Sequence, residues 1–430
     1  MRDASGPPPL LRSAIFGVCL VTSGGPACGS ARGTGGSASE DNAQSSSAST
    51  EGANGAATSS ATASSAMSTT SGSGGSSAAG DSGETFAPGN PSSACTSGVP
   101  SRGQLVDTSK PTTVVGSGSP ASCTFSALSA AVSQGGIITF DCGGNPTTIT
   151  VTSTLNLPTT TSTVIDGGGT ITLDGGGAVE LLSFDSGNWQ VNTNGLTLQR
   201  LTLAHGKTTP TDAIPPAPAP CSQGWDDGEG GAVFVRDGSL TVIDSIFEGN
   251  QAALLGPDTG GGAIYVEGSK GGVLIAGSTF TGNQGANGGA MGTLWAELDV
   301  YSSVFSNNVA TGNGANNNDP SECSAMNNGQ NEVGSGGNGG ALYNDGENAN
   351  VILCGDTITN NDAGSGAFGG GLFFTSDNFS GTLTITDTTM TGNTGGHWTT
   401  VQSGSVTNAG TAVGVNALSI TVTSSTLQGL

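Results

Sequence analysis

Short runs of alternating apolar and polar residues recur over the last three quarters of the chain. Leu240 and Val242 lie two residues apart, and so do Leu298 and Val300, with polar residues between them. A period of two is typical of β-strands, because successive side chains point to opposite faces. Gly and Asn punctuate most of the runs, as they do in turns. The pattern predicts an all-β domain over residues 95–430.

The strongest feature is an internal repeat over residues 230–430. Each unit opens with Gly-Gly-Ala-apolar or a close variant and closes with apolar-x-x-Asn. The second opening position and the closing Asn are, in the five clear units, Gly231 and Asn250, Gly262 and Asn283, Gly289 and Asn308, Gly340 and Asn361, and Gly371 and Asn393. Each pair is 19 to 22 residues apart, and a degenerate sixth unit ends at Leu430. Units of nearly constant length with variable gaps predict a stacked solenoid, and this unit length suits one turn of a parallel β-helix.

The repeated Gly and Asn residues have structural roles in this interpretation. A Gly pair suits a tight corner that needs a positive φ angle. A recurrent Asn suits a turn in which its amide bonds to its own backbone and to the Asn of the neighbouring turn. We therefore expect these residues to be corners of the fold and not a catalytic set.

The open end of a solenoid needs a cover. Residues 124–134 carry Phe125, Leu128, Ala131 and Val132 on one helical face, and Gly135 and Gly136 follow. The segment therefore predicts a short N-terminal capping helix. Strand-like runs between this helix and residue 230 predict early turns with poorer motifs.

The pairing of Gly-Gly-Ala-Ile with Phe-x-x-Asn resembles the repeats of chlamydial polymorphic outer-membrane proteins. It is also similar to many β-helix proteins of bacterial surfaces. The resemblance covers residues 230–430 and implies a right-handed parallel β-helix with a surface role, often adhesion. The chlamydial proteins end in a membrane-embedded barrel, whereas this sequence ends in a strand unit. We therefore expect a lipid anchor in place of self-export.

Two N-terminal segments precede the β domain. Residues 1–28 combine Arg2 and Arg12 with a short apolar stretch and small residues, which is typical of an export signal. The end of this segment resembles a bacterial lipoprotein signal, which implies lipidation of Cys28; ordinary cleavage and free secretion is the alternative. Residues 29–94 are almost entirely Ser, Ala, Gly and Thr. Such a composition predicts a disordered linker.

Charge excludes several partners. The 430 residues include 9 basic and 32 acidic residues, a net charge of −23. Nucleic-acid binding depends on Lys and Arg meeting phosphate, so we expect no nucleic-acid partner. No run of 18 apolar residues is present, so we expect membrane contact only through the lipid anchor.

Six cysteines follow the signal, and an even number in an exported chain suggests disulfides. Fifteen pairings are open. We favour Cys123–Cys142, which ties the capping helix to the next strand, and Cys323–Cys354, which ties down the longest loop. Cys95–Cys221 then remains. No cysteine or histidine spacing is typical of zinc, and we expect no metal site of that kind.

Candidate chemistry concentrates in one loop. Trp225, Asp226, Asp227 and Glu229 follow a proline-rich stretch and precede the first Gly-Gly-Ala. A Trp beside carboxylates suits a sugar platform or a calcium site, and a solvated loop is the structural alternative. If the protein is an enzyme, Asp226, Asp227 and Glu229 are the candidate catalytic residues, because a glycosidase needs two carboxyl groups. Residues 95–430 hold 26 acidic and six basic residues, which disfavours an acidic sugar polymer unless calcium intervenes.

We therefore predict an extracellular or outer-membrane surface protein that binds a polysaccharide or a component of another cell's surface. Loops 207–229 and 309–339 would carry specificity, because loops on a rigid scaffold usually do. No cofactor is expected, apart from calcium if the acidic loop binds it. The alternatives are a carbohydrate-active enzyme on the same fold and a purely structural envelope protein.

Overall fold

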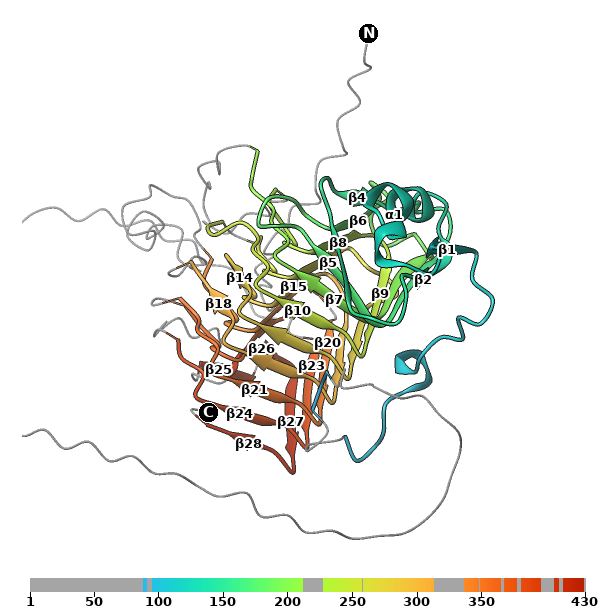
Figure 1. Cartoon of the computed structure of the whole chain (residues 1–430). Coiled ribbons are helices and arrows are strands. Elements are labelled where there is room, and N and C mark those ends of the chain that lie inside the picture. Colours follow the sequence, from blue (N-terminus) through green and yellow to red (C-terminus); the bar gives the residue numbers. More distant parts are fainter. Residues whose placement is uncertain are drawn as a thin grey trace, which may run out of the picture. The chain divides into compact units, whose positions relative to one another are not determined.

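The computed structural model describes residues 88–90, 95–211, 227–256, 258–312, 336–347, 349–364, 367–376, 380–395, 406–409 and 413–428. Two long sheets dominate these residues, and their strands pair in parallel from one repeat unit to the next. Among the described strands, only β25 and β26 pair antiparallel. The predicted β class is confirmed, and the long parallel sheets are compatible with a stacked solenoid (Figure 1).

The larger sheet contains seventeen strands: β1 (Thr113–Gly116), β2 (Gly136–Asp141), β3 (Thr147–Thr150), β5 (Thr163–Asp174), β7 (Gly195–Ala204), β9 (Ser239–Ile243), β10 (Ile246–Glu248), β12 (Val273–Ala276), β13 (Thr279–Thr281), β16 (Leu298–Tyr301), β17 (Val304–Ser306), β20 (Asn350–Cys354), β21 (Thr357–Thr359), β23 (Thr382–Thr386), β24 (Thr389–Thr391), β27 (Ser419–Thr423) and β28 (Thr426–Leu427). The second sheet contains nine strands: β4 (Leu155–Asn156), β6 (Leu182–Asp185), β8 (Val233–Arg236), β11 (Ile264–Glu267), β15 (Met291–Leu294), β19 (Leu342–Asp345), β22 (Leu372–Thr375), β25 (Val406–Ala409) and β26 (Val413–Ala417). A third, two-stranded sheet pairs β14 (Gln284–Gly285) with β18 (Val309–Ala310).

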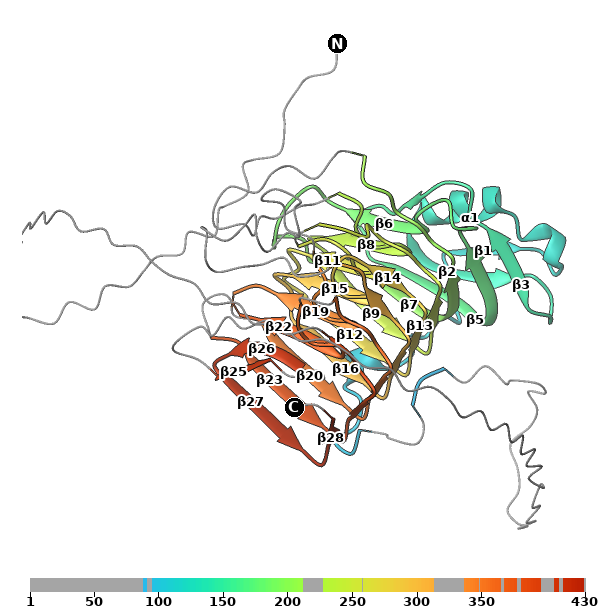
Figure 2. The ribbon, with the colours of Figure 1, turned by 90° about the vertical axis from the view of Figure 1, so that its left-hand side faces the viewer.

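Each clear repeat unit contributes one strand to the nine-stranded sheet and two to the larger sheet. In the first unit these are β8, β9 and β10, which pair in register with β11, β12 and β13 of the second unit. Figure 2 shows the same order continuing down the stack to β27 and β28. Every unit therefore places equivalent residues directly above one another.

The core consists of rows of identical or similar side chains between the sheets. The rings of Phe247, Phe280 and Phe305 are fully buried and stack with centroids 4.7 Å apart. That distance matches the spacing of neighbouring strands, so the sheet itself brings the rings into contact. Burial of such rows stabilises the stack by about 1.5–3 kcal/mol for each large apolar side chain.

The two glycines of each opening pair have different roles. Gly230 has a φ of +58°, which favours glycine at this corner. Gly231 has no positive φ; a Cβ there would lie only 2.3 Å from the carbonyl oxygen of Gly262 in the next unit. The second glycine thus allows two units to approach closely. In the fifth unit the pair is Gly369–Gly370, one residue earlier than predicted. Leu372 aligns with Leu342 of the fourth unit, so Gly371 takes the place that Ala341 has there.

Helix α1 (Phe125–Val132) lies over the end of the stack formed by the first strands (Figure 1). Thr124 caps it by accepting a hydrogen bond from the Ala127 backbone N–H at 3.2 Å. Leu128 and Val132 are buried in the main core. The predicted capping helix is therefore present. Two short 3₁₀ turns, Ser101–Gly103 and Pro120–Ser122, precede it.

The disulfides confirm one predicted pair and correct the other two. Cys123 is bonded to Cys142, as expected. Cys95 is bonded to Cys354, so the predicted Cys323–Cys354 and Cys95–Cys221 pairings are wrong. The N-terminal chain crosses the outside of the larger sheet and brings Cys95 to β20, a contact that the repeat pattern does not encode. Cys221 and Cys323 lie outside the described residues.

The folded part begins before Cys95. Asn90 is buried, and its backbone N–H donates to the Ser302 carbonyl at 2.9 Å. The end of the predicted linker is therefore packed on the domain. The predicted signal, the lipidation residue Cys28 and linker residues up to 87 lie outside the described residues. Within the described chain, no helix is long and apolar enough to span a membrane.

Candidate functional site

The predicted ligand loop is only partly described. Trp225 and Asp226 lie outside the described residues, so the structure leaves their roles as predictions. The Asp227 carboxylate accepts hydrogen bonds from the backbone N–H of Thr211 at 2.6 Å and from its hydroxyl at 3.1 Å. These bonds join the two ends of the loop, which is a structural role. The Glu229 side chain turns inward and is 4% exposed.

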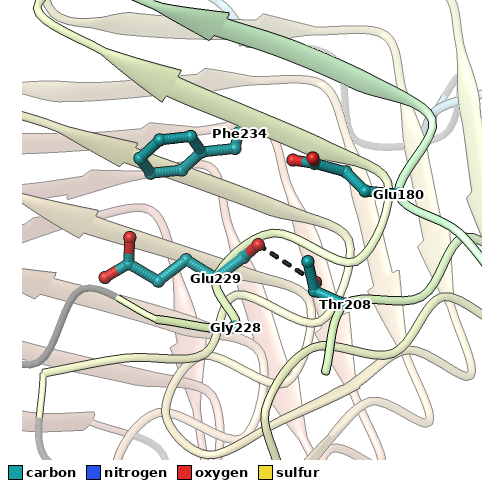
Figure 3. Close-up of a pocket in the computed structure, with 5 residues that line it drawn as sticks. All are labelled: Glu180, Thr208, Gly228, Glu229 and Phe234. Atoms are coloured by element: carbon teal, nitrogen blue, oxygen red, sulfur yellow. Dashed lines mark hydrogen bonds between the residues drawn. The ribbon is translucent and has the colours of Figure 1, made fainter. Parts of the chain in front are cut away.

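Glu229 lies in a pocket beside the start of β8. The pocket has a volume of about 130 Å³ and is lined by Glu180, Thr208, Gly228, Glu229 and Phe234. Figure 3 shows the carboxyl group of Glu180 extending toward Phe234, with the Glu229 side chain below the ring in that view. The Thr208 hydroxyl donates to the Glu229 carbonyl at 3.0 Å and fixes the backbone of the pocket wall.

The pocket forms where the glycine repeat begins. Leu182 pairs with Val233, so Glu180 occupies the position that Gly231 occupies one unit later. From Gly231 onward, the backbones of successive units approach so closely at this position that no side chain fits. In the preceding unit the corner has room for a side chain, and the carboxyl group of Glu180 occupies it.

The electrostatics of Glu180 are unusual. Its Oε1 atom is buried and has no hydrogen-bond partner. Burial, and secondarily the negative charge of Asp185, raise the pKa of Glu180 well above its ordinary value. The group therefore keeps its proton at a pH where an ordinary glutamate is ionised. A protonated carboxyl group can donate one hydrogen bond and still accept others.

Phe234 supplies the apolar wall of the pocket. Its ring carries the guanidinium group of Arg236 at 5.5 Å from the ring centroid, within the range of a cation–π contact. Arg236 also pairs with Glu267 and, at 3.7 Å, with Asp185. Burial alone would lower the pKa of Arg236, but the charges of Glu267, Asp185 and Glu229 outweigh it and raise the pKa. The arginine thus stays charged and holds the ring in place.

Phe234 begins an aromatic row along the outer face of the nine-stranded sheet. The register aligns Phe234, Tyr265, Gly292, Tyr343 and Phe373 in five successive strands. Tyr265 and Tyr343 are fully buried, whereas Phe234 and Phe373 are half-buried. The Tyr343 hydroxyl contacts the carboxylates of Asp258 at 3.1 Å and Asp345 at 2.7 Å. The two tyrosines of the row are therefore covered by other residues of the protein, and Phe234 is the member that lines the pocket.

The described residues contain no group of three or more His, Cys, Asp or Glu side chains arranged to hold a metal ion. Two glutamates, Glu180 and Glu229, line the pocket, and burial favours the protonated form of Glu180. Calcium binding by the acidic loop remains a prediction that involves Asp226, outside the described part.

The sequence pattern missed Glu180 and Phe234. Both lie outside the acidic cluster that drew attention to the loop. One signal was available in the sequence. Glu180 precedes Leu182 by two residues, as Gly231 precedes Val233. Among the aligned units of the described chain, it is the only charged residue at this position. Recognising it requires the strand register of a unit that lacks the motif.

Three comparisons with known proteins add no relative. No protein-family model, no curated protein and no solved structure matches the chain.

Proposed function

We propose that the protein is an exported, lipid-anchored surface protein whose right-handed parallel β-helix binds a neutral polysaccharide. The observation that supports the proposal is the pocket at residues 180 and 229, beside the corner from which loop 207–229 leaves the stack. It combines the ring of Phe234 with the side chains of Glu180, whose pKa is raised, and Glu229. A rigid stack of parallel strands suits the presentation of such a site.

The chemistry of the pocket fits a sugar ring. A sugar presents C–H groups, which pack on an aromatic face such as that of Phe234. Its hydroxyl groups exchange hydrogen bonds with carboxyl groups such as those of Glu180 and Glu229. An apolar cavity of about 150 Å³ accommodates benzene, so one six-membered ring matches this pocket in size.

Charge favours a neutral polymer. Residues 95–430 carry 26 acidic and six basic residues, and the resulting field repels a polyanion. We therefore expect neutral glucans, mannans or galactans to bind and uronic-acid polymers not to bind in the absence of calcium.

Affinity electrophoresis of the full mature chain through neutral and acidic polysaccharides, with and without calcium, tests the proposal. Glu229→Gln should weaken retention by at least tenfold, because an amide NH2 group, which donates hydrogen bonds, replaces one carboxylate oxygen, which accepts them. Glu248→Gln, an exposed glutamate in β10, is the matched control and should bind as the wild type. Equal retention of both variants on the polymer that the wild type binds would overturn the assignment of the pocket.

A carbohydrate-active enzyme is the second candidate, and one observation favours it. Glu180 and Glu229 line one pocket, and the raised pKa of Glu180 suits a general acid. A glycosidase needs such an acid and a second carboxylate. Release of new reducing ends or unsaturated products in the same mixtures, abolished by Glu180→Gln, would identify the enzyme. Retention without products favours the binding protein. The absence of both retention and products favours a structural envelope protein.

The lipid anchor is tested separately. In a bacterial host fed radioactive palmitate, the wild type should carry label and sediment with membranes. Cys28→Ser should lose the label and leave the membrane fraction, whereas Cys19→Ser should keep both properties. Free secretion of the wild type without label would favour ordinary signal cleavage.

A further inference from the structure

An N-terminal strap crosses the outer face of the larger sheet. We define the strap as residues 88–90 and 95–112; it is drawn in blue and cyan in Figure 1. Its first residues lie along the second to fourth units: the Gly89 backbone N–H donates to the Thr279 hydroxyl at 2.9 Å, and the Asn90 side-chain amide donates to the Gly355 carbonyl at 3.0 Å and to the Thr357 hydroxyl at 2.6 Å. Thr96 contacts the Asp387 carboxylate through its backbone N–H at 2.9 Å and its hydroxyl at 2.6 Å. The chain therefore meets the domain along its middle units and reaches the fourth and fifth units at Cys95 and Thr96.

The centre of the strap is held by one arginine. Arg102 donates to the carbonyls of Gly271 at 2.6 Å, Leu240 at 2.9 Å and Gly272 at 2.9 Å, and to the Thr241 hydroxyl at 3.1 Å. These acceptors belong to two successive units. The planar guanidinium group thus joins the strap to both, which a lysine could not do with the same geometry.

The strap ends beside the first units. The Gln199 side chain accepts from the Val106 N–H at 2.9 Å and donates to the Val106 carbonyl at 3.2 Å. The Thr108 hydroxyl then donates to the buried carboxylate of Asp166 at 2.7 Å. From there the chain reaches β1 and the capped end of the stack.

A single outward row of the sheet forms the track of the strap. The register aligns Cys354, Tyr301, Ala276, Ile243, Gln199 and Asp166 in six successive strands. Five steps of about 4.8 Å span about 24 Å. Cys95 is bonded to the first member of this row, and Val99 packs against the apolar cluster of Leu274, Ala276 and Tyr301. The covalent bond thus lies at the end where the N-terminal chain arrives.

We propose that the strap and its disulfide transmit mechanical force between the N-terminal chain and the domain. A pull on the N-terminal chain reaches Cys95 and passes through the disulfide directly into β20. When the opposing pull acts on the C-terminus, the chain between Cys95 and Cys354, a separation of 259 residues, carries none of it. The attachment also lies near the later units, so the capped end and the pocket at residues 180 and 229 are held away from it. The inference rests on the N-terminal chain being the anchor, which is part of the proposed function.

Optical-tweezers extension of the full chain, with one handle at each terminus, tests this load path. Without reductant, the wild type should extend without the segment between Cys95 and Cys354. A reductant introduced after folding should release that segment and add about 900 Å of length, at about 3.5 Å per residue. The variant Cys95→Ser/Cys354→Ser, in the same reductant, should give the added length from the first pull and should show the strap detaching before the stack unfolds.

The variant Cys123→Ser/Cys142→Ser is the matched control, because it removes the other disulfide and leaves the strap bond. Without reductant it should extend as the wild type does. The proposal is overturned if the unreduced wild type already extends to the reduced length, or if the strap never detaches as a separate step in the variant without its disulfide. Neither readout involves a sugar or a lipid, so failure of the proposed ligand or anchor leaves this test unaffected.

Discussion

The side-chain amide of Asn250 donates a hydrogen bond of 2.9 Å to Oδ1 of Asn283, 33 residues further along the chain. The same oxygen accepts from the Asn250 backbone N–H at 3.0 Å. The arrangement repeats unit by unit through Asn308, Asn361 and Asn393. Each amide also donates to a main-chain carbonyl, such as that of Leu203 for Asn250. A continuous ladder of buried amides therefore runs along the stack and fixes the register of the units.

The ladder predicts a large effect for a change at its centre. Asn308→Ala removes bonds to both neighbours and leaves buried donors and acceptors without partners. We expect a loss of about 2–4 kcal/mol in the free energy of unfolding. Asn188→Ala, at an exposed turn, should cost far less. Chemical denaturation followed by circular dichroism measures both, and similar losses would show that the ladder contributes little.

Close packing in the aromatic row predicts a second effect. A Cβ on Gly292 would lie 2.6 Å from two ring carbons of Tyr265. Gly292→Ala should therefore displace the ring and lower the free energy of unfolding by about 1–3 kcal/mol. Gly144 also has no positive φ and has no neighbouring atom within 4 Å of its would-be Cβ. Gly144→Ala should be neutral or slightly stabilising. A Gly292→Ala protein with wild-type stability would contradict the packing.

A buried acid predicts the pH dependence of stability. Asp356 stands in a row otherwise made of hydroxyls, between Ser303 and Thr388, and burial raises its pKa well above the ordinary value. Because the folded-state pKa exceeds the unfolded-state pKa, the stabilising effect of its proton is complete at low pH and is lost as pH rises. Asp356→Ser replaces the acid with the hydroxyl of its neighbours.

We therefore expect the gain in stability of Asp356→Ser over the wild type to grow as the pH increases from 4 to 8, to about 1–3 kcal/mol. Thermal unfolding across this range measures the gain. The exposed Asp141→Ser should show no such growth. A constant difference between Asp356→Ser and the wild type would contradict the raised pKa of Asp356.

The pocket predicts a pH dependence of binding. Since burial raises the pKa of Glu180, its carboxyl group keeps a proton that it can donate to a sugar up to a higher pH than an ordinary glutamate does, and loses that ability as the pH rises through its pKa. Retention by the wild type should therefore fall at high pH. Glu180→Gln keeps a donor at every pH and should flatten the profile of retention between pH 5 and 9. A falling profile in the variant would assign the effect to another group.

The repeat residues were predictable because each one solves a local problem that recurs in every unit. Asn250 and Gly231 could be assigned to corners from spacing alone. The sequence could not show that Gly231 is required by the approach of Gly262, because that distance depends on how two units stack. The one-residue error at Gly371 has a similar cause, since three consecutive glycines leave the register open.

The strap and the pocket were not predictable in the same way. Cys95 meets Cys354 because the N-terminal chain runs back along the stack, and no periodicity records that path. Glu180 belongs to a unit without the Gly-Gly-Ala motif, so the pattern gave no register for it. Both features depend on contacts between segments that differ in sequence, whereas the repeat describes contacts between segments that are alike.

The most direct test of the central claim compares two phenylalanines of one aromatic row. Isothermal titration of the full mature chain with the neutral oligosaccharide from the polymer that retains it gives the affinity of each variant. Phe234→Leu, in the pocket, should weaken binding at least tenfold. Phe373 does not line the pocket, and its ring stacks on that of Tyr343 with the centroids 5.4 Å apart; Phe373→Leu should therefore bind as the wild type. Equal affinities of the two variants and the wild type would contradict sugar binding at this pocket.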